Sequence, residues 1–126
     1  MNEQLATDFD DWLVLTYARV GSFTVLVILV DIGENSVSPL RSTHLHVVGD
    51  EIRWPEMVRL LDSARVAWHG AAFFQADRDG LVNDADAKLR LGSLVRHLNE
   101  DRKILNDGEF FDRRGLRLKL EEVASG

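Results

Sequence analysis

Two apolar stretches separated by a glycine and a serine open the regular pattern of the chain. Both stretches, Trp12–Val20 and Phe23–Ile32, are rich in residues that favour extended backbone. Between them, Gly21 occupies the first central position that a type II′ turn requires, followed by Ser22. The pattern therefore predicts an N-terminal β-hairpin over residues 12–32.

The second stretch shows no polar alternation between Val25 and Val30, so a strand there is apolar on both sides. Its side chains divide into two sets: Val25, Val27 and Leu29 on one side, and Leu26, Ile28 and Val30 on the other. Two helices cover only one side of a small sheet. We expect a homo-oligomer whose interface includes Leu26, Ile28 and Val30, unless the loop 33–42 or the N-terminal segment folds over that side.

The stretch from Pro55 to Phe74 has two interpretations. Proline suits the first turn of a helix, and apolar residues at helical spacing continue from there. Four alanines among residues 66–76 favour a helix that runs unbroken to Phe74. The alternative ends the helix near Ala64 and makes Val66–Gln75 a buried strand, because an apolar run in a core looks alike in both states.

The remaining segments give clearer signals. A turn-rich loop over residues 33–42 precedes a strand at Thr43–Val48. A helix is expected from Asn83 or Asp84, either of which can cap it, to about Asp101. Turn signals then bracket a short stretch at 109–111, and residues 116–121 alternate cleanly as a C-terminal strand.

Together these elements predict an α+β fold for one domain over residues 1–126. We expect two layers: an antiparallel sheet of about four strands, formed by the N-terminal hairpin, the third strand and the C-terminal strand, with two helices packed on one face.

Composition narrows the function classes. The chain has 126 residues and no cysteine, which excludes disulfides, thiolate zinc sites and a cysteine nucleophile. A net charge of -6 opposes phosphate attraction, so a nucleic acid is not the expected partner. The acidic N-terminus lacks the positive region of a secretory signal, and Arg19 within the apolar run 12–32 argues against a membrane span. We expect a cytoplasmic protein.

Two histidines are candidate metal ligands. His44 and His46 are two apart on a predicted strand, so their side chains project from the same face and can reach one ion such as zinc. A metal site needs further ligands, and no spacing in the sequence ties another residue to this pair. Two solvent-facing histidines on a strand are the alternative interpretation.

The acidic segment 75–86 partly matches a twelve-position calcium loop. Its candidate ligands are Asp77, Asp79, Asn83 and Asp86, with Gly80 at the position of the sharp turn. Gln75 replaces the expected first aspartate, and Asp86 is shorter than the usual closing glutamate. Turn formation and capping of the next helix account for the same residues without a metal.

No phosphate-binding loop, nucleophile elbow or zinc-protease motif is present. With Val66–Gln75 as a strand, the order β-β-β-α-β-α resembles the topology of ribonuclease H-like nucleases, which would make Asp31, Asp77 and Glu56 metal ligands. The chain departs from that family because the strand predicted at Trp12–Val20 carries no acid.

The absence of catalytic motifs and the apolar hairpin predict a non-enzymatic interaction or assembly module. It would act through a surface patch as a homo-oligomer, with no cofactor and an unidentified protein partner. The alternative is a metal-dependent enzyme or a calcium-responsive protein that uses the acidic loop 75–86 or the pair His44 and His46.

Overall fold

One antiparallel sheet, with strand order β2-β1-β3-β4, organises the fold. The computed structural model describes residues 6–120. The elements in chain order are α1 (Asp8–Val20), β1 (Phe23–Ile32), β2 (Val37–Val47), α2 (Trp54–Asp62), β3 (Gly70–Gln75), α3 (Asp84–Glu100), the 3-10 helix η1 (Arg102–Asp107) and β4 (Glu109–Asp112). The predicted α+β class with a four-stranded antiparallel sheet is confirmed.

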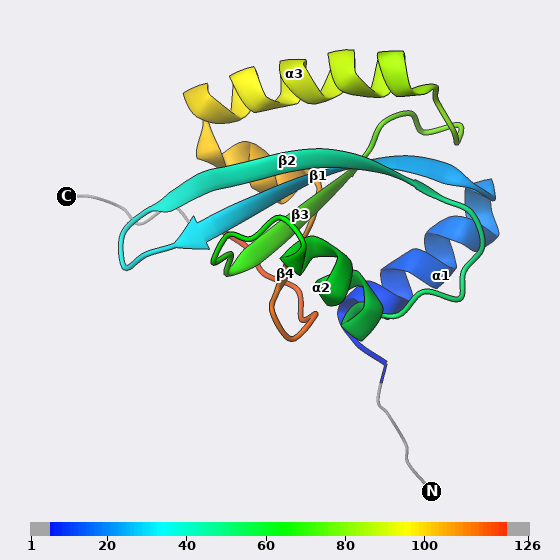
Figure 1. Cartoon of the computed structure of the whole chain (residues 1–126), viewed down its shortest axis with the longest axis horizontal. Coiled ribbons are helices and arrows are strands. Elements are labelled where there is room, and N and C mark those ends of the chain that lie inside the picture. Colours follow the sequence, from blue (N-terminus) through cyan, green and yellow to red (C-terminus); the bar gives the residue numbers. More distant parts are fainter. Residues whose placement is uncertain (1–5, 121–126) are drawn as a thin grey trace, which may run out of the picture.

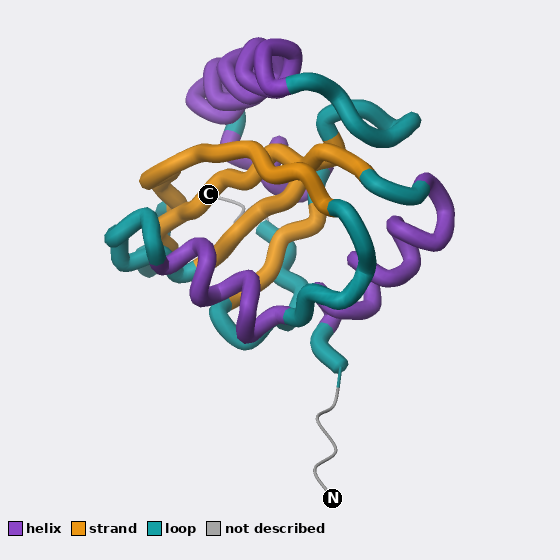
Figure 2. The backbone as a smooth tube through the Cα atoms, turned by 45° about the vertical axis from the view of Figure 1, so that its right-hand side comes forward, coloured by secondary structure: helices purple, strands orange, loops and turns teal. Residues whose placement is uncertain are grey.

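Helices cover both faces of this sheet. Figure 1 shows α3 above the sheet and α1 and α2 below it, and the turned view of Figure 2 agrees. Phe9 of α1 and Met57 of α2 share a buried cluster with Val27 of β1. On the other face Leu98 of α3 packs with Ile28. The two predicted helices, which correspond to α2 and α3, were expected on one face of the sheet. They lie on opposite faces.

The predicted N-terminal hairpin is wrong in its first half, because residues 8–20 form helix α1. Thr7 caps this helix by accepting a hydrogen bond from the backbone N–H of Asp10, whose side chain accepts one from the N–H of Thr7. Gly21, with φ 74°, ends the helix instead of forming a hairpin turn. Among the described residues no helix combines the length and apolar character that crossing a membrane requires.

The strand alternative for the alanine-rich segment is correct. Helix α2 ends at Asp62, and Arg65 adopts a left-handed φ of 59° that turns the chain back toward the sheet. β3 then lies between β1 and β4 and pairs with both. Gly70 is required there, because a Cβ atom would lie 2.8 Å from the ring of Phe110. Pairing on two sides outweighs the helix propensity of the alanines.

The two edge strands, β2 and β4, cover other residues than the predicted edge strands did. β2 begins at Val37, so residues 37–42 of the expected loop are strand, and Pro39 lies opposite Val30 at an irregularity in the register. The predicted C-terminal strand at 116–121 is wrong where the structure describes it, because β4 forms this edge of the sheet and Arg117 makes only a single bridge to Phe111. The end of the predicted strand, at residue 121, lies outside the described residues.

The predicted interface residues are core residues of the chain itself. Leu26 is 4% exposed, and Ile28 and Val30 are fully buried. The prediction assumed that two helices cover one side, whereas α3 and η1 cover the side that was left open. These three side chains therefore offer no surface to a second copy.

Gly80, in the loop before α3, should tolerate no side chain. Its φ of 129° disfavours any L-residue, and a Cβ atom would lie 3.0 Å from the carbonyl oxygen of Ser22. Gly80→Val should lower the free energy of unfolding by more than about 1 kcal/mol. Gly92→Ala is the control, since Gly92 lies in α3 with open space around it and should gain up to about 1 kcal/mol. Denaturant unfolding of both variants checks this, and an unchanged Gly80→Val would contradict it.

Candidate functional site

Two histidines lie side by side on the edge strand β2, over the face that α3 covers. In the β1–β2 register His44 is opposite Leu26 and His46 is opposite Thr24. The two imidazole rings have centroids 5.5 Å apart. The prediction that both side chains project from one face is therefore confirmed.

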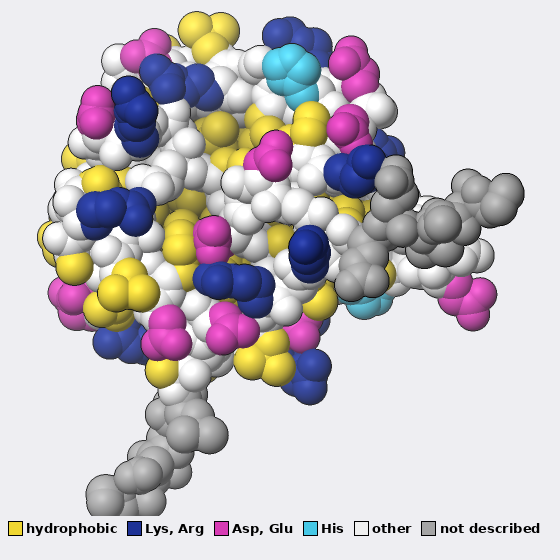
Figure 3. Space-filling model, turned by 180° about the vertical axis from the view of Figure 1, so that it is seen from behind, with side chains coloured by type: hydrophobic (Ala, Val, Ile, Leu, Met, Phe, Trp, Pro, Cys, Tyr) yellow, Lys and Arg dark blue, Asp and Glu magenta, His cyan; other side chains and the backbone are white. Residues whose placement is uncertain are grey.

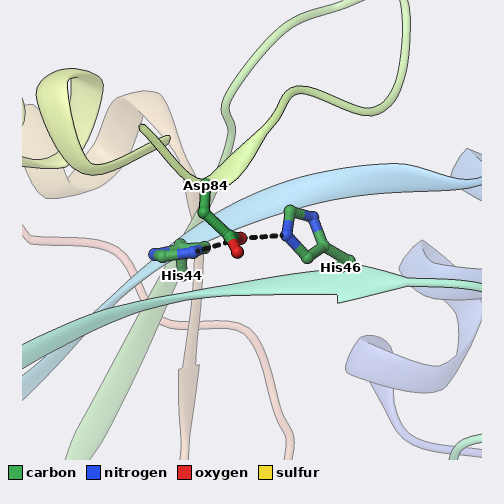
Figure 4. Close-up of side chains that lie close together, drawn as sticks. All are labelled: His44, His46 and Asp84. Atoms are coloured by element: carbon green, nitrogen blue, oxygen red, sulfur yellow. Dashed lines mark hydrogen bonds and ion pairs between the residues drawn. The ribbon is translucent and has the colours of Figure 1, made fainter. Parts of the chain in front are cut away.

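The first residue of α3 completes the group. Oδ1 of Asp84 lies 3.0 Å from Nε2 of His44 and 2.6 Å from Nε2 of His46. Figure 4 shows the carboxylate reaching down from the start of α3 between the two rings. Strand β2 and helix α3 are thereby joined through one oxygen atom.

The loop 76–83 places Asp84 here because Thr24 of β1 holds it at both ends. The N–H of Ala76 donates to the carbonyl of Thr24 at 2.9 Å, and the N–H of Val82 donates to its hydroxyl at 3.0 Å. Asn83 then caps α3 by accepting from the N–H of Asp86 at 2.8 Å. These bonds place the start of α3 where the side chain of Asp84 meets β2.

The hydrogen bonds fix the protons of both rings. An ionised carboxylate only accepts hydrogen bonds, so Nε2 of each histidine carries the proton it shares with Asp84. Hydrogen bonds from His46 and then His44 hold the pKa of the Asp84 carboxyl below its usual value of 3.8. The carboxylate is 70% exposed, whereas the side chain of His44 is only 16% exposed.

This arrangement supplies three metal-ligand atoms. One atom from each of His44, His46 and Asp84 lies within 4.8 Å of the others. Across residues 6–120 no other three His, Asp or Glu side chains come together in this way. The sequence indicated the two histidines but missed Asp84, which it assigned only to the cap of the helix. No local signal identifies it, because the contact depends on the path of the loop.

The acidic residues proposed for a calcium loop do not converge on one point. Asp77 accepts from the N–H of Asp79 at 3.1 Å and lies 3.9 Å from the guanidinium of Arg90. The amide oxygen of Asn83 is used in the cap. Asp77, Asp79 and Asp86 do not form a ligand group, and the entering helix that such a loop needs is replaced by strand β3.

The topology of ribonuclease H-like nucleases is not present, because the chain begins with α1 and all the paired strands are antiparallel. Asp31 instead lies 2.8 Å from Nδ1 of His69. On the face seen in Figure 3, acidic and basic side chains are interspersed. Arg113 and Arg117 pair with Asp62 and Glu109, so these arginines form no purely basic surface.

Comparison with protein-family models, with curated proteins and with solved structures finds no match to this chain. The chemistry of the group formed by His44, His46 and Asp84 is therefore the basis for a functional argument.

The lowered pKa of Asp84 predicts how its contribution to stability depends on pH. The carboxylate should stabilise the fold fully above pH 3.8, and this contribution should disappear as the pH falls through the lowered folded pKa. At pH values well above 3.8, Asp84→Asn should therefore have a lower melting temperature than the wild type. This difference should shrink as the pH falls. Melting curves across this range measure it.

Asp86→Asn is the control, since Asp86 is an acid of the same first turn that lies outside the three-residue group. A melting difference for Asp84→Asn that persists unchanged at the acid end would contradict the prediction.

Proposed function

We propose that the protein binds a divalent transition-metal ion, best matched by zinc, through His44, His46 and Asp84. The observation that carries the proposal is the convergence of their three ligand atoms within 4.8 Å. Two imidazoles and a carboxylate form a ligand set that zinc prefers, and two imidazoles disfavour calcium and magnesium, which prefer oxygen ligands.

The geometry needs little adjustment to hold such an ion. Tetrahedral bonds of about 2.0 to 2.1 Å place neighbouring ligand atoms about 3.3 Å apart. The histidine nitrogens now lie 3.0 and 2.6 Å from the carboxylate oxygen, so these two distances would widen by less than 1 Å. The two nitrogens lie within 4.8 Å of each other and would draw closer where they are more than about 3.3 Å apart. The ion would replace the two protons that hold these atoms together.

The position of the site suggests what the ion does. It would tie the first turn of α3 to the edge strand β2 at the exposed Asp84. Three protein ligands leave one coordination position open on the solvent side, as in metal sites that hold a water molecule or a group from another molecule. We therefore propose a metal-dependent protein whose ion is both a link in the fold and an accessible Lewis acid.

Titration with Zn²⁺ tests the proposal. Zn²⁺ at 100 times its dissociation constant should stabilise the chain by about 2.7 kcal/mol, which a melting curve resolves. Co²⁺ should give the visible absorption bands of a tetrahedral site, and Ca²⁺ should produce no shift.

His46→Ala and Asp84→Asn should each abolish the stabilisation by Zn²⁺. Asp86→Asn changes the same charge in the same turn of α3 and should respond as the wild type does. Absence of any Zn²⁺ shift in the wild type, or an equal shift in all variants, would refute the metal site.

A second candidate function is self-association through the outer edge of β2, which keeps the predicted assembly role but moves it to a new surface. β2 is a terminal strand of the sheet, and beside it two adjoining cavities of about 340 and 290 Å³ share Leu45 and Leu60 as lining residues. Val48 and Leu60 are 73% and 45% exposed there. An edge strand can pair antiparallel with a second copy about a two-fold axis, which would cover both residues.

Sedimentation at micromolar concentration tests this association. The proposal predicts a species heavier than the 14.3 kDa chain, which Leu60→Asp returns to the mass of one chain without unfolding it. Leu89→Asp is the matched control, because Leu89 is 73% exposed on α3 and lines neither of the two cavities. A single species of 14.3 kDa at every concentration would exclude the association.

A further inference from the structure

Thr24 is the one polar residue in the buried part of β1, and its hydroxyl lies directly behind the candidate metal site. Its side chain is fully buried. Oγ1 lies 2.8 Å from Nδ1 of His46, 3.0 Å from the backbone N–H of Val82 and 3.3 Å from the carbonyl oxygen of Val82. A hydroxyl has one proton and two lone pairs, so these three neighbours offer it two different hydrogen-bond arrangements.

The first arrangement belongs to the metal-free protein. Nε2 of neutral His46 carries the proton that it donates to Asp84, so Nδ1 is an acceptor. The hydroxyl of Thr24 donates to Nδ1 while it accepts from the N–H of Val82. In this arrangement the hydroxyl proton points to Nδ1 and not to the carbonyl of Val82.

The second arrangement is the one a metal requires. An ion takes the lone pair of Nε2, so the ring proton must reside on Nδ1, and the ring stays neutral. Nδ1–H then donates to Oγ1 of Thr24, and the hydroxyl proton turns to the carbonyl of Val82 at 3.3 Å. The change needs a tautomer exchange of His46, in which Nε2 gives its proton to solvent and Nδ1 takes one up, together with the rotation of one hydroxyl. It needs no movement of the backbone.

We propose that Thr24 is the positioning residue of the metal site, whose hydroxyl rotates between His46 and the Val82 carbonyl and so allows His46 to present Nε2 to the ion. This inference rests on the proposed metal site. Outer hydrogen-bond partners of this type fix the tautomer and the orientation of metal-bound histidines. Within the described part of the chain the hydrogen bonds of the His44 ring involve Nε2 alone, so His46 is the better-oriented ligand.

Zn²⁺ affinity of Thr24 variants tests the role. Thr24→Val keeps the shape but removes the hydroxyl, and it should weaken Zn²⁺ binding about 10- to 100-fold. Thr24→Ser should restore most of that affinity. Thr43→Val, on the same strand as the histidines, should bind as the wild type does. Equal affinity of folded Thr24→Val and wild type would overturn the inference while leaving the metal site intact.

Imidazole ¹⁵N chemical shifts of the wild type give a second test that does not depend on the folding of Thr24→Val. In the metal-free protein His46 should be protonated at Nε2, and in the Zn²⁺-loaded protein at Nδ1. Coordination of Zn²⁺ through Nδ1 of His46 would overturn the role of Thr24. A wild type that takes up no Zn²⁺ would instead refute the metal site itself.

Discussion

The burial of β1 on both faces is the constraint on which the rest of the structure depends. Residues 23–30 are all buried, so the chain must supply apolar surface above and below one strand. Helix α1 and helix α2 meet Val25, Val27 and Leu29, whereas α3 and η1 cover Leu26, Ile28 and Val30. Each such residue contributes roughly 1.5 to 3 kcal/mol when it leaves water, so the helices are held mainly by this strand.

The sequence indicated that β1 is covered on both faces, but it did not indicate which elements cover it. The unbroken apolar run of β1 predicted cover on both sides, and the cap at Asn83 predicted the start of α3. Helix α1 was missed because its strand-favouring residues outweighed the reciprocal cap formed by Thr7 and Asp10. A second copy is not needed to cover β1, because α3 and η1 pack on the face opposite to α1 and α2.

Only the two histidines of the candidate site could be predicted from the sequence, because they lie on one strand. A spacing of two on a strand places His44 and His46 together whatever the rest of the fold does. Asp84 is remote in sequence and meets them only because the loop 76–83 is bound to Thr24. Local patterns predict contacts within an element, but a contact between elements depends on loops whose path is set by tertiary hydrogen bonds.

Thr24 links the buried strand β1 to the candidate metal site. A buried hydroxyl costs free energy unless it is hydrogen-bonded, and a valine would fit the apolar strand more simply. Here the hydroxyl holds the loop through Val82 and contacts the ring of His46 at 2.8 Å, so the cost is offset by two contacts that lie outside the core. Thr24, buried near the start of β1, thus contacts both the loop that carries the carboxylate and one imidazole, which explains how a site on an edge strand acquires a defined geometry.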